Sequence, residues 1–254
     1  MVRRLKKDVM KDLPPLTEVV VPLEMTPAGA KEYRKAEDDF IAWLRETYPQ
    51  RATAARKAER LVRAGYLKRL TGRVKLPAVK QWIDDFRQQA DEKLLVFGIQ
   101  RDGFVLDLAQ HYGRAATAVT GKVTGRDRQR CFDRFNDDKA CTLFFGNMVA
   151  AGVGWSCRSA STAVIAELDW VPANHAQAVG RVHGQGRGVP GRPSMAYWLV
   201  ARNTMDEHLV KIVRDKQALS DAVLDGVPRD KQKDKVLDQL EKVMLAAAKK
   251  GGFR

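Results

Sequence analysis

Gln177 and Arg181 lie one helical turn apart and are the side chains of this sequence best placed for chemistry. They follow a buried apolar run at 162–168 and precede a basic loop that is rich in glycine. Open α/β sheets bind ligands just beyond the carboxyl ends of buried strands, which is where this pattern puts the two side chains. An arginine there can stabilise charge on a transferred phosphoryl group, an effect of roughly 10³–10⁵ in turnover. The competing interpretation is a surface arginine that bonds the end of its helix, and helix position alone favours that interpretation.

A second candidate is the segment MVAAGVGWSC at 148–157, which follows an apolar strand. Its glycines, Gly152 and Gly154, would let backbone amide groups approach a phosphate closely at the carboxyl end of that strand. Two glycines at this spacing are equally typical of a tight turn, so the segment taken alone indicates no ligand.

A complete nucleotide site is not found in the sequence. No G-x-x-x-x-G-K-[ST] motif occurs, and Thr120-Gly121-Lys122 lacks the upstream glycine at the required distance. Glu167 and Asp169 follow an apolar run, but without a phosphate-binding loop they are poor evidence for magnesium. The 4 histidines and 3 cysteines show no spacing typical of a metal site, so no bound metal is expected. We therefore do not expect a hydrolase that works alone.

The charge of the chain predicts a polyanionic partner. The 254 residues carry a formal net charge of +14 and are 44% hydrophobic, which is enough to bury a core. Residues 51–80 concentrate this charge, because they hold ten Lys and Arg and only one acid, Glu59. Arg56, Arg60 and Arg63 lie three to four residues apart and share one helix face. A solvated face is the alternative, but we favour a surface that follows the phosphates of DNA.

The sequence predicts an intracellular protein, cytoplasmic or nuclear, that is not secreted and has no membrane partner. Its cysteines are scattered, which fits a reducing compartment. The basic first residues lack the continuous apolar core of a signal peptide. No stretch approaches the roughly 20 apolar residues of a membrane span.

From residue 93 onward, apolar strands alternate with helical patterns, which predicts a doubly wound, mainly parallel sheet flanked by helices. The expected strands are 94–98, 115–120, 141–145, 162–168 and 194–201, and the expected helices are 101–112, 124–135 and 204–224. Thr204 to Glu207 has the sequence of a capping box, which marks the start of the last of these helices.

The flanking segments predict a helical insertion before the sheet and a helix after it. A strand at 17–25 contains Pro22, which allows only an edge position, and Thr26-Pro27 starts a helix. Residues 51–80 are expected to form one or two helices, interrupted at Thr71-Gly72 and Pro77, with a further helix at 78–90. We divide the chain into a linker and basic helical segment (1–92), the α/β lobe (93–226) and a mixed-charge helix and tail (227–254).

The order of its motifs decides between these open interpretations. The chain resembles the C-terminal, second RecA-like lobe of Swi/Snf-like DNA helicase and translocase ATPases of superfamily two, with spellings most similar to the annealing-helicase subgroup. The resemblance runs from about residue 3 to 226. It rests on RRLKKDVMKDLPPLTEVVVPLEMTPAGAKEYRKA, KLLVFGIQRDGFVLDLAQ, TGKVTGRDRQRCFDRFN, AAGVGWSC, ELDWVPANHAQAVGRVH and NTMDEHLVKIVRDKQALSDAVLDG.

This resemblance implies a RecA-like fold and a division of labour between two lobes. Gln177 and Arg181 would face ATP that a separate first lobe holds together with Mg²⁺. The motif V residues, Gly152, Gly154 and Ser156, would couple DNA contact to the nucleotide state. Gly121, Arg128 and Phe135 would be the recurring residues of the third segment, and we count Arg128 among the DNA contacts. The expected function is the second motor lobe of an ATP-dependent translocase on double-stranded DNA, with DNA and the first lobe as partners.

Three departures from the family pattern matter. The family writes motif VI as Q-x-x-G-R-x-H-R-x-G-Q, and Gly184 stands here in place of its second arginine. Arg187 lies three residues later and is our candidate for the missing cation. Ser156 stands where the family often has Asn, and the first lobe with its phosphate-binding motifs is missing. The alternative function is therefore a non-catalytic DNA-binding or interaction module that has kept the fold without motor activity.

Overall fold

The computed structural model describes residues 15–47, 54–151, 155–184, 187–223 and 229–249. The described residues form one sheet of six strands in the order β1-β6-β5-β2-β4-β3, and every printed strand pair is parallel. The doubly wound parallel sheet predicted from the sequence is therefore confirmed. The strands are β1 (Leu16–Leu23), β2 (Leu94–Gly98), β3 (Ala116–Val119), β4 (Leu143–Asn147), β5 (Thr162–Ile165) and β6 (Ser194–Ala201).

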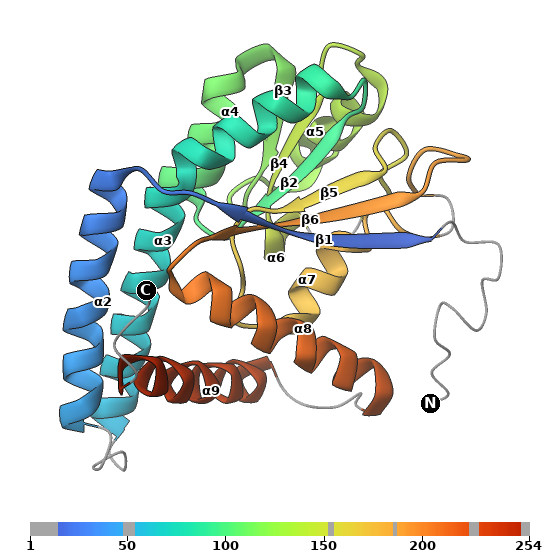
Figure 1. Cartoon of the computed structure of the whole chain (residues 1–254). Coiled ribbons are helices and arrows are strands. Elements are labelled where there is room, and N and C mark those ends of the chain that lie inside the picture. Colours follow the sequence, from blue (N-terminus) through green and yellow to red (C-terminus); the bar gives the residue numbers. More distant parts are fainter. Residues whose placement is uncertain (1–14, 48–53, 152–154, 185–186, 224–228, 250–254) are drawn as a thin grey trace.

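Helices cover both faces of the sheet (Figure 1). Alternate side chains of each strand point to opposite faces, so Leu95 and Phe97 enter one apolar cluster and Leu94 and Val96 enter the other. The helices are α2 (Pro27–Thr47), α3 (Ala54–Gln89), α4 (Leu106–Tyr112), α5 (Gly125–Asp137), α6 (Met148–Ala151), α7 (Pro172–Val179), α8 (Met205–Val223) and α9 (Arg229–Lys249), with short turns η2 (Arg101–Val105) and η3 (Gly113–Ala115).

The edge position predicted for the strand that contains Pro22 is confirmed. The β1 strand pairs only with β6 in the described sheet, in a register that runs from Leu16 opposite Ser194 to Leu23 opposite Ala201. Pro22 has no backbone N–H, and an edge strand tolerates that loss because one side of it makes no ladder. The sheet thus takes its outer strand from residues far from the other five in sequence.

The predicted breaks in the basic segment and the separate helix at 78–90 are wrong, because α3 runs without a break from Ala54 to Gln89. Thr71 is buried, and its hydroxyl donates to the carbonyl of Leu67 at 2.9 Å inside the same helix. Gly72 is needed for close packing rather than for a turn, as described below. Pro77 is exposed, and the carbonyl that it leaves without a helical donor belongs to Arg73, which is also exposed.

Two helix starts can be compared with the expected caps. At α2 the hydroxyl of Thr26 accepts from the backbone N–H of Gly29 at 3.1 Å, as a helix start there requires. At α8 the hydroxyl of Thr204 instead accepts from the N–H of Asp206 at 3.1 Å, so the bond expected of a capping box to Glu207 is not the one formed. Within the described residues, no helix is both long enough and apolar enough to cross a membrane.

Candidate functional site

Arg181 lies two residues beyond the end of α7, with its guanidinium turned inward. The carbonyl of the next residue, Val182, accepts from the hydroxyl of Ser194 at the start of β6, so Arg181 lies beside the amino ends of the strands. The position predicted for it at the carboxyl edge of the sheet is therefore wrong. One guanidinium nitrogen donates to the backbone carbonyl of Trp155, and Nε donates to the carbonyl of Gln177 at 3.3 Å. The residue is only 9% exposed. Gln177 and Arg181 are therefore in contact, as predicted, but the contact is made by the backbone carbonyl of Gln177 and not by its side chain. The same arginine also bonds the segment that follows α6.

A second guanidinium lies close to the first. Arg187 is partly buried and donates to the carbonyl of Gly180, one residue before Arg181. Burial, and after it the charge of Arg187, lowers the pKa of Arg181. No carboxylate of the described residues lies within ion-pair distance of either side chain. Two cations that repel each other and lack an anionic partner are suited to a shared anion such as a phosphate.

A backbone bond to Gly184 and a turn at Gly188 hold Arg187 in this position. Its backbone N–H donates to the carbonyl of Gly184 at 3.0 Å, and the N–H of Gly188 donates to the carbonyl of Cys157 at 2.9 Å. Gly188 has a φ of 72°, and a Cβ there would lie 2.8 Å from the carbonyl oxygen of Val182. Only glycine fits this turn without a shift of the backbone.

The segment that contains motif V packs against the same arginine. Gly152 and Gly154 lie outside the described residues. The ring of Trp155 stacks on Phe132 at a centroid distance of 4.4 Å and an interplanar angle of 5°, and its indole N–H donates to the carbonyl of Ala151 at 2.9 Å. Ser156 is exposed, as a residue that contacts a ligand would be. The structure therefore ties motif V to motif VI through the carbonyl of Trp155.

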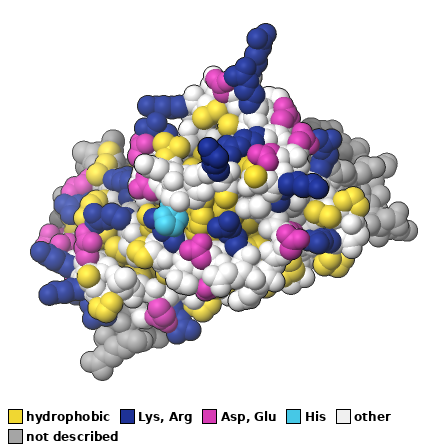
Figure 2. Space-filling model, turned by 90° about the horizontal axis from the view of Figure 1, so that it is seen from above, with side chains coloured by type: hydrophobic (Ala, Val, Ile, Leu, Met, Phe, Trp, Pro, Cys, Tyr) yellow, Lys and Arg dark blue, Asp and Glu magenta, His cyan; other side chains and the backbone are white. Residues whose placement is uncertain are grey.

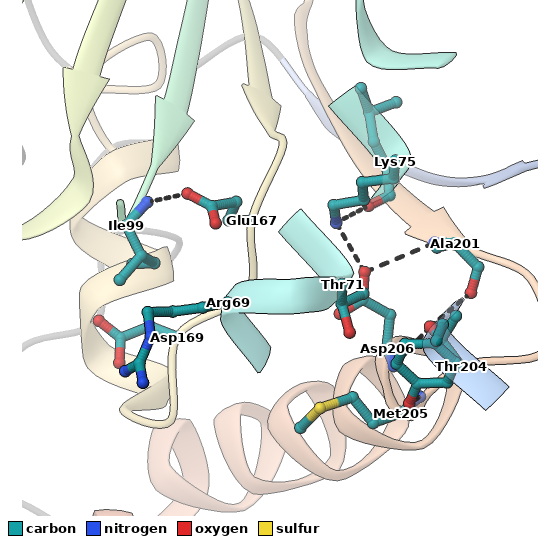
Figure 3. Close-up of polar contacts among 12 residues, drawn as sticks. Arg69, Thr71, Lys75, Ile99, Glu167, Asp169, Ala201, Thr204, Met205 and Asp206 are labelled. Atoms are coloured by element: carbon teal, nitrogen blue, oxygen red, sulfur yellow. Dashed lines mark hydrogen bonds and ion pairs between the residues drawn. The ribbon is translucent and has the colours of Figure 1, made fainter. Parts of the chain in front are cut away.

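Glu167 ties three segments together at the carboxyl edge (Figure 3). Its buried carboxylate accepts from the backbone N–H groups of Ile99 and Gln100 at 2.6 and 2.8 Å, and from the Gln100 side chain at 2.6 Å. A Cβ at Gly72 would lie 2.4 Å from a Glu167 oxygen, so α3 can approach only because residue 72 is glycine. The sequence marks Glu167 as an acid after an apolar run, but it does not indicate that this carboxylate bonds the backbone after β2.

Asp169 fixes the start of α7. Its carboxylate accepts from the N–H of Val171 at 3.2 Å and from the side-chain amide of Asn174 at 2.8 Å, while its own N–H donates to Nε2 of His175 at 2.9 Å. Burial opposes ionisation of this carboxyl, but the charge of Lys68 and these hydrogen bonds outweigh it, so the pKa of Asp169 lies below its usual range. Burial lowers the pKa of His175 to about 4. Histidine spacing in the sequence gave no sign of this contact.

Both carboxylates that end β5 are therefore bonded to backbone and side-chain amides. In the part of the chain that the structure describes, no group of three or more His, Cys, Asp or Glu side chains is arranged to hold a metal ion.

The cations predicted on α3 are partly engaged inside the molecule. Arg60 pairs with Asp238 of α9 at 2.5 Å and lies 3.6 Å from Glu241. Arg63 pairs with Glu59 at 2.9 Å and lies over the ring of Trp43, 5.1 Å from its centroid. Arg56 lies in α3, but its side chain is outside the described set.

Arg128 of α5 is also bonded within the chain, because its Nε donates to the carbonyl of Val123 at 3.0 Å. Figure 2 looks down on the molecule and shows Lys and Arg side chains spread among acidic ones rather than gathered in one patch. The structure thus brings Gln177, Arg181 and Arg187 together and places Arg128 and the α3 cations elsewhere.

Residues 74–186 match the helicase conserved C-terminal domain. The chain is 26% identical over 263 residues to Protein CHROMATIN REMODELING 4 of Arabidopsis thaliana, covering 93% of this chain and 12% of that protein. It is 27% identical over 234 residues to the DNA annealing helicase and endonuclease ZRANB3 of Mus musculus, covering 89% of this chain and 21% of that protein. The chain thus spans between 12% and 21% of the length of the curated relatives it matches.

Solved structures show the same RecA-like fold. The C-terminal part of the Fun30 ATPase domain superposes with a TM-score of 0.68 at 14% identity, covering 93% of this chain and 99% of that one. The Sulfolobus solfataricus SWI2/SNF2 ATPase core in complex with dsDNA superposes with a TM-score of 0.62 at 16% identity, covering 98% of this chain and 52% of that one.

Proposed function

The chain contains a helicase conserved C-terminal domain of the SWI2/SNF2 kind, and from this premise we propose that it is the second motor lobe of an ATP-dependent translocase on double-stranded DNA. The observation that carries the proposal is the guanidinium pair of Arg181 and Arg187 beyond the end of α7. Neither has a carboxylate partner among the described residues, and mutual repulsion adds to burial in lowering the pKa of Arg181.

The residues of this chain are suited to contact the phosphates of a nucleotide, but they do not form a complete nucleotide-binding site. The sequence has no phosphate-binding loop, so ATP and its Mg²⁺ are held by a separate first lobe. Bound ATP supplies the phosphoryl group that is transferred to water. In this chain Arg181 and Arg187 offset the charge of that group, and Gln177 contributes an uncharged hydrogen-bonding side chain beside them. Arg187 takes the part of the arginine that Gly184 cannot supply.

DNA is the proposed second partner. A DNA-binding protein acts inside the cell, so we propose an intracellular location. The net charge of +14 favours a polyanion, and Ser156 is exposed beside the Trp155 carbonyl that holds Arg181. We assign Gly152, Gly154 and Ser156 to the coupling of DNA contact to the nucleotide state. Arg128 and the α3 cations Arg56, Arg60 and Arg63 add contacts to the DNA backbone.

The test is to combine this chain with a first RecA-like lobe of a SWI2/SNF2 ATPase and to measure ATP hydrolysis with and without double-stranded DNA. Each lobe alone serves as the control. Hydrolysis that requires both lobes and rises with DNA supports the proposal. DNA binding by this chain without hydrolysis in any combination contradicts it.

One observation favours the alternative of a non-catalytic DNA-binding or interaction module. Arg181 is 9% exposed and donates inward to Trp155, and Gly184 provides no second cationic fork. A lobe that had lost its motor function would keep such a buried contact, because the contact stabilises the fold. The same mixing experiment separates the two functions.

A further inference from the structure

Lys68 of α3 reaches the carboxyl edge of the sheet from outside the residues that match the helicase domain. Its ammonium nitrogen lies 4.9 Å from the centroid of the Trp170 ring, and the side chain is partly buried. Trp170 lies at the end of the run that leads from β5 into α7, and it is 8% exposed. An ammonium group over the face of an indole is attracted by the negative charge of that face, and more strongly when water is excluded.

The turn of α3 that carries Lys68 is held firmly against the sheet (Figure 3). The backbone carbonyl of Arg69 accepts from the Gln100 side chain at 3.1 Å, and Gly72 packs against Glu167. One turn further, Lys75 forms a buried ion pair with Asp206 at 2.6 Å and donates to the carbonyl of Leu199 at 3.0 Å. Lys68 is therefore presented by a fixed support rather than by a free helix.

The positive charge of Lys68 also acts on Asp169, which precedes α7 and bonds its first turn. It is the strongest charge that favours ionised Asp169, whose carboxylate bonds the N–H of Val171 and the amide of Asn174. Gln177 is the sixth residue of α7, and Arg181 lies two residues beyond the end of the helix. If Asp169 lost its charge, its bonds to the first turn of α7 would weaken, and the helix would lose its fixed start.

On the proposed function, we infer that Lys68 is a positioning residue of the phosphate-facing site: through Trp170 and Asp169 it fixes the start of α7 and so the place of Gln177 and Arg181. The charged groups that face Lys68 are Asp169 and Glu167 after β5, Asp206 of α8 and Lys233 of α9. Burial and Lys233 work against its charge, and the three carboxylates support it. Lys68 thus links the helical insertion to the start of α7, the helix that carries Gln177 and leads to Arg181.

His175 reports on this arrangement in the chain alone. Burial lowers its pKa, the Asp169 charge raises it, and the Lys68 charge lowers it. The change Lys68→Met keeps an unbranched side chain over Trp170, one atom shorter, and removes the charge. We expect the pKa of His175 to rise by about one unit, measured by proton NMR of the imidazole signals between about pH 7.5 and about pH 3. Lys68→Arg keeps the charge and should keep the low value.

Two further variants make the result decisive. Lys80→Met removes an ammonium group from the same helix, and Lys80 is not among the charges that act on His175, so it should leave the His175 titration unchanged. Lys68→Gln replaces Lys68→Met if the latter does not fold. An unchanged His175 pKa in both neutral Lys68 variants, or equal shifts in Lys68→Met and Lys80→Met, would overturn the inference.

The second readout is ATP hydrolysis by this chain combined with a first lobe. Lys68→Met should lower kcat about tenfold with little change in the DNA concentration for half-maximal activity, because only alignment is lost. Lys68→Arg should restore it. If the unaltered chain gives no hydrolysis, the proposed function fails, while the His175 titration still decides the role of Lys68. An equal loss of DNA affinity and of kcat would count against positioning.

Discussion

The guanidinium of Arg181 donates a hydrogen bond to the backbone carbonyl of Trp155, so the cation that follows α7 is held by the segment that follows α6. The ring of the same tryptophan is fixed by its stack on Phe132. A shift of this segment would therefore move or release the arginine. A contact at Ser156, the next residue, would act on Arg181 by this route.

Replacing Arg181 by Ala should lower the stability of the fold, in addition to any effect on activity. The change leaves the buried carbonyl of Trp155 without this donor, which costs about 1–3 kcal/mol in the free energy of unfolding. Urea unfolding followed by circular dichroism measures the loss. Arg187→Ala, at a less buried position, is the comparison and should cost less. Equal losses in the two variants would show that the Arg181 contact is not special.

Arg187 should matter to catalysis as much as Arg181 does. In the two-lobe assay, Arg187→Ala is expected to lower kcat about 10³-fold, as strongly as Arg181→Ala, because both cations would face the same phosphoryl group. Arg192→Ala, at an exposed position in the next turn, is the control. ATP hydrolysis that is unaffected by Arg187→Ala would remove this residue from the site.

Two glycines of α3 should respond in opposite directions to the same change. A Cβ at Gly72 would lie 2.4 Å from the Gln100 side chain and from Glu167, so Gly72→Ala should destabilise by about 1–3 kcal/mol. A Cβ at Gly65 would come no closer than 3.4 Å to any atom, the nearest being the end of Arg69. Gly65→Ala should therefore stabilise by up to about 1 kcal/mol through helix propensity. Chemical denaturation of both variants tests the pair, and the same sign in both would refute the packing role of Gly72.

The raised pKa of Glu37 should make the stability of the protein depend on pH. Burial raises its pKa from 4.5 to about 7, although the hydroxyl of Tyr33 donates to it at 3.0 Å. Because the folded state binds this proton more tightly, the contribution to stability is complete below about pH 4.5 and is lost as the pH rises to about 7. Glu37→Gln removes the ionisable group and should stabilise the protein by about 3 kcal/mol at most at about pH 8, with little effect near pH 5.

The matched control for this prediction is Glu32→Gln, an exposed carboxyl on the same helix. Thermal unfolding across the pH range should show the same slope for Glu32→Gln as for the unaltered chain and a flatter slope for Glu37→Gln. Identical slopes in all three proteins would contradict the raised pKa of Glu37.

Where local pattern and tertiary structure agree, the sequence predicts this fold well. The alternation of strands and helices after residue 93 is confirmed, and Pro22 correctly marks β1 as an edge strand. The break expected at Thr71-Gly72 is wrong because Glu167, almost a hundred residues away, determines why residue 72 is small. A local turn signal and a demand for close packing look the same in a sequence.

For the candidate site, too, local features could be predicted from the sequence and long-range contacts could not. The start of α7 beyond the carboxyl end of β5 could be predicted from the apolar run before it. The place of Arg181 could not, because α7 runs back and puts this residue beside the amino ends of the strands. The inward bond of Arg181 could not, because it depends on a carbonyl in another loop. Likewise, the contact of Lys68 with Trp170 and the pairing of Arg60 with Asp238 arise from how α3 lies against distant segments. Spacing along one helix carries no information about such partners.

The pairing of β1 with β6 has a consequence for the order of folding. Leu16 finds its partner only at Ser194, so every element before β6, and β6 itself, must be synthesised before the outer strand can form its ladder. Contacts of such long range slow folding, and a strand that waits exposes unpaired backbone groups to other chains. The α2–α3 hairpin can form early from local contacts, whereas the edge strand that precedes it completes the sheet only after β6 has left the ribosome.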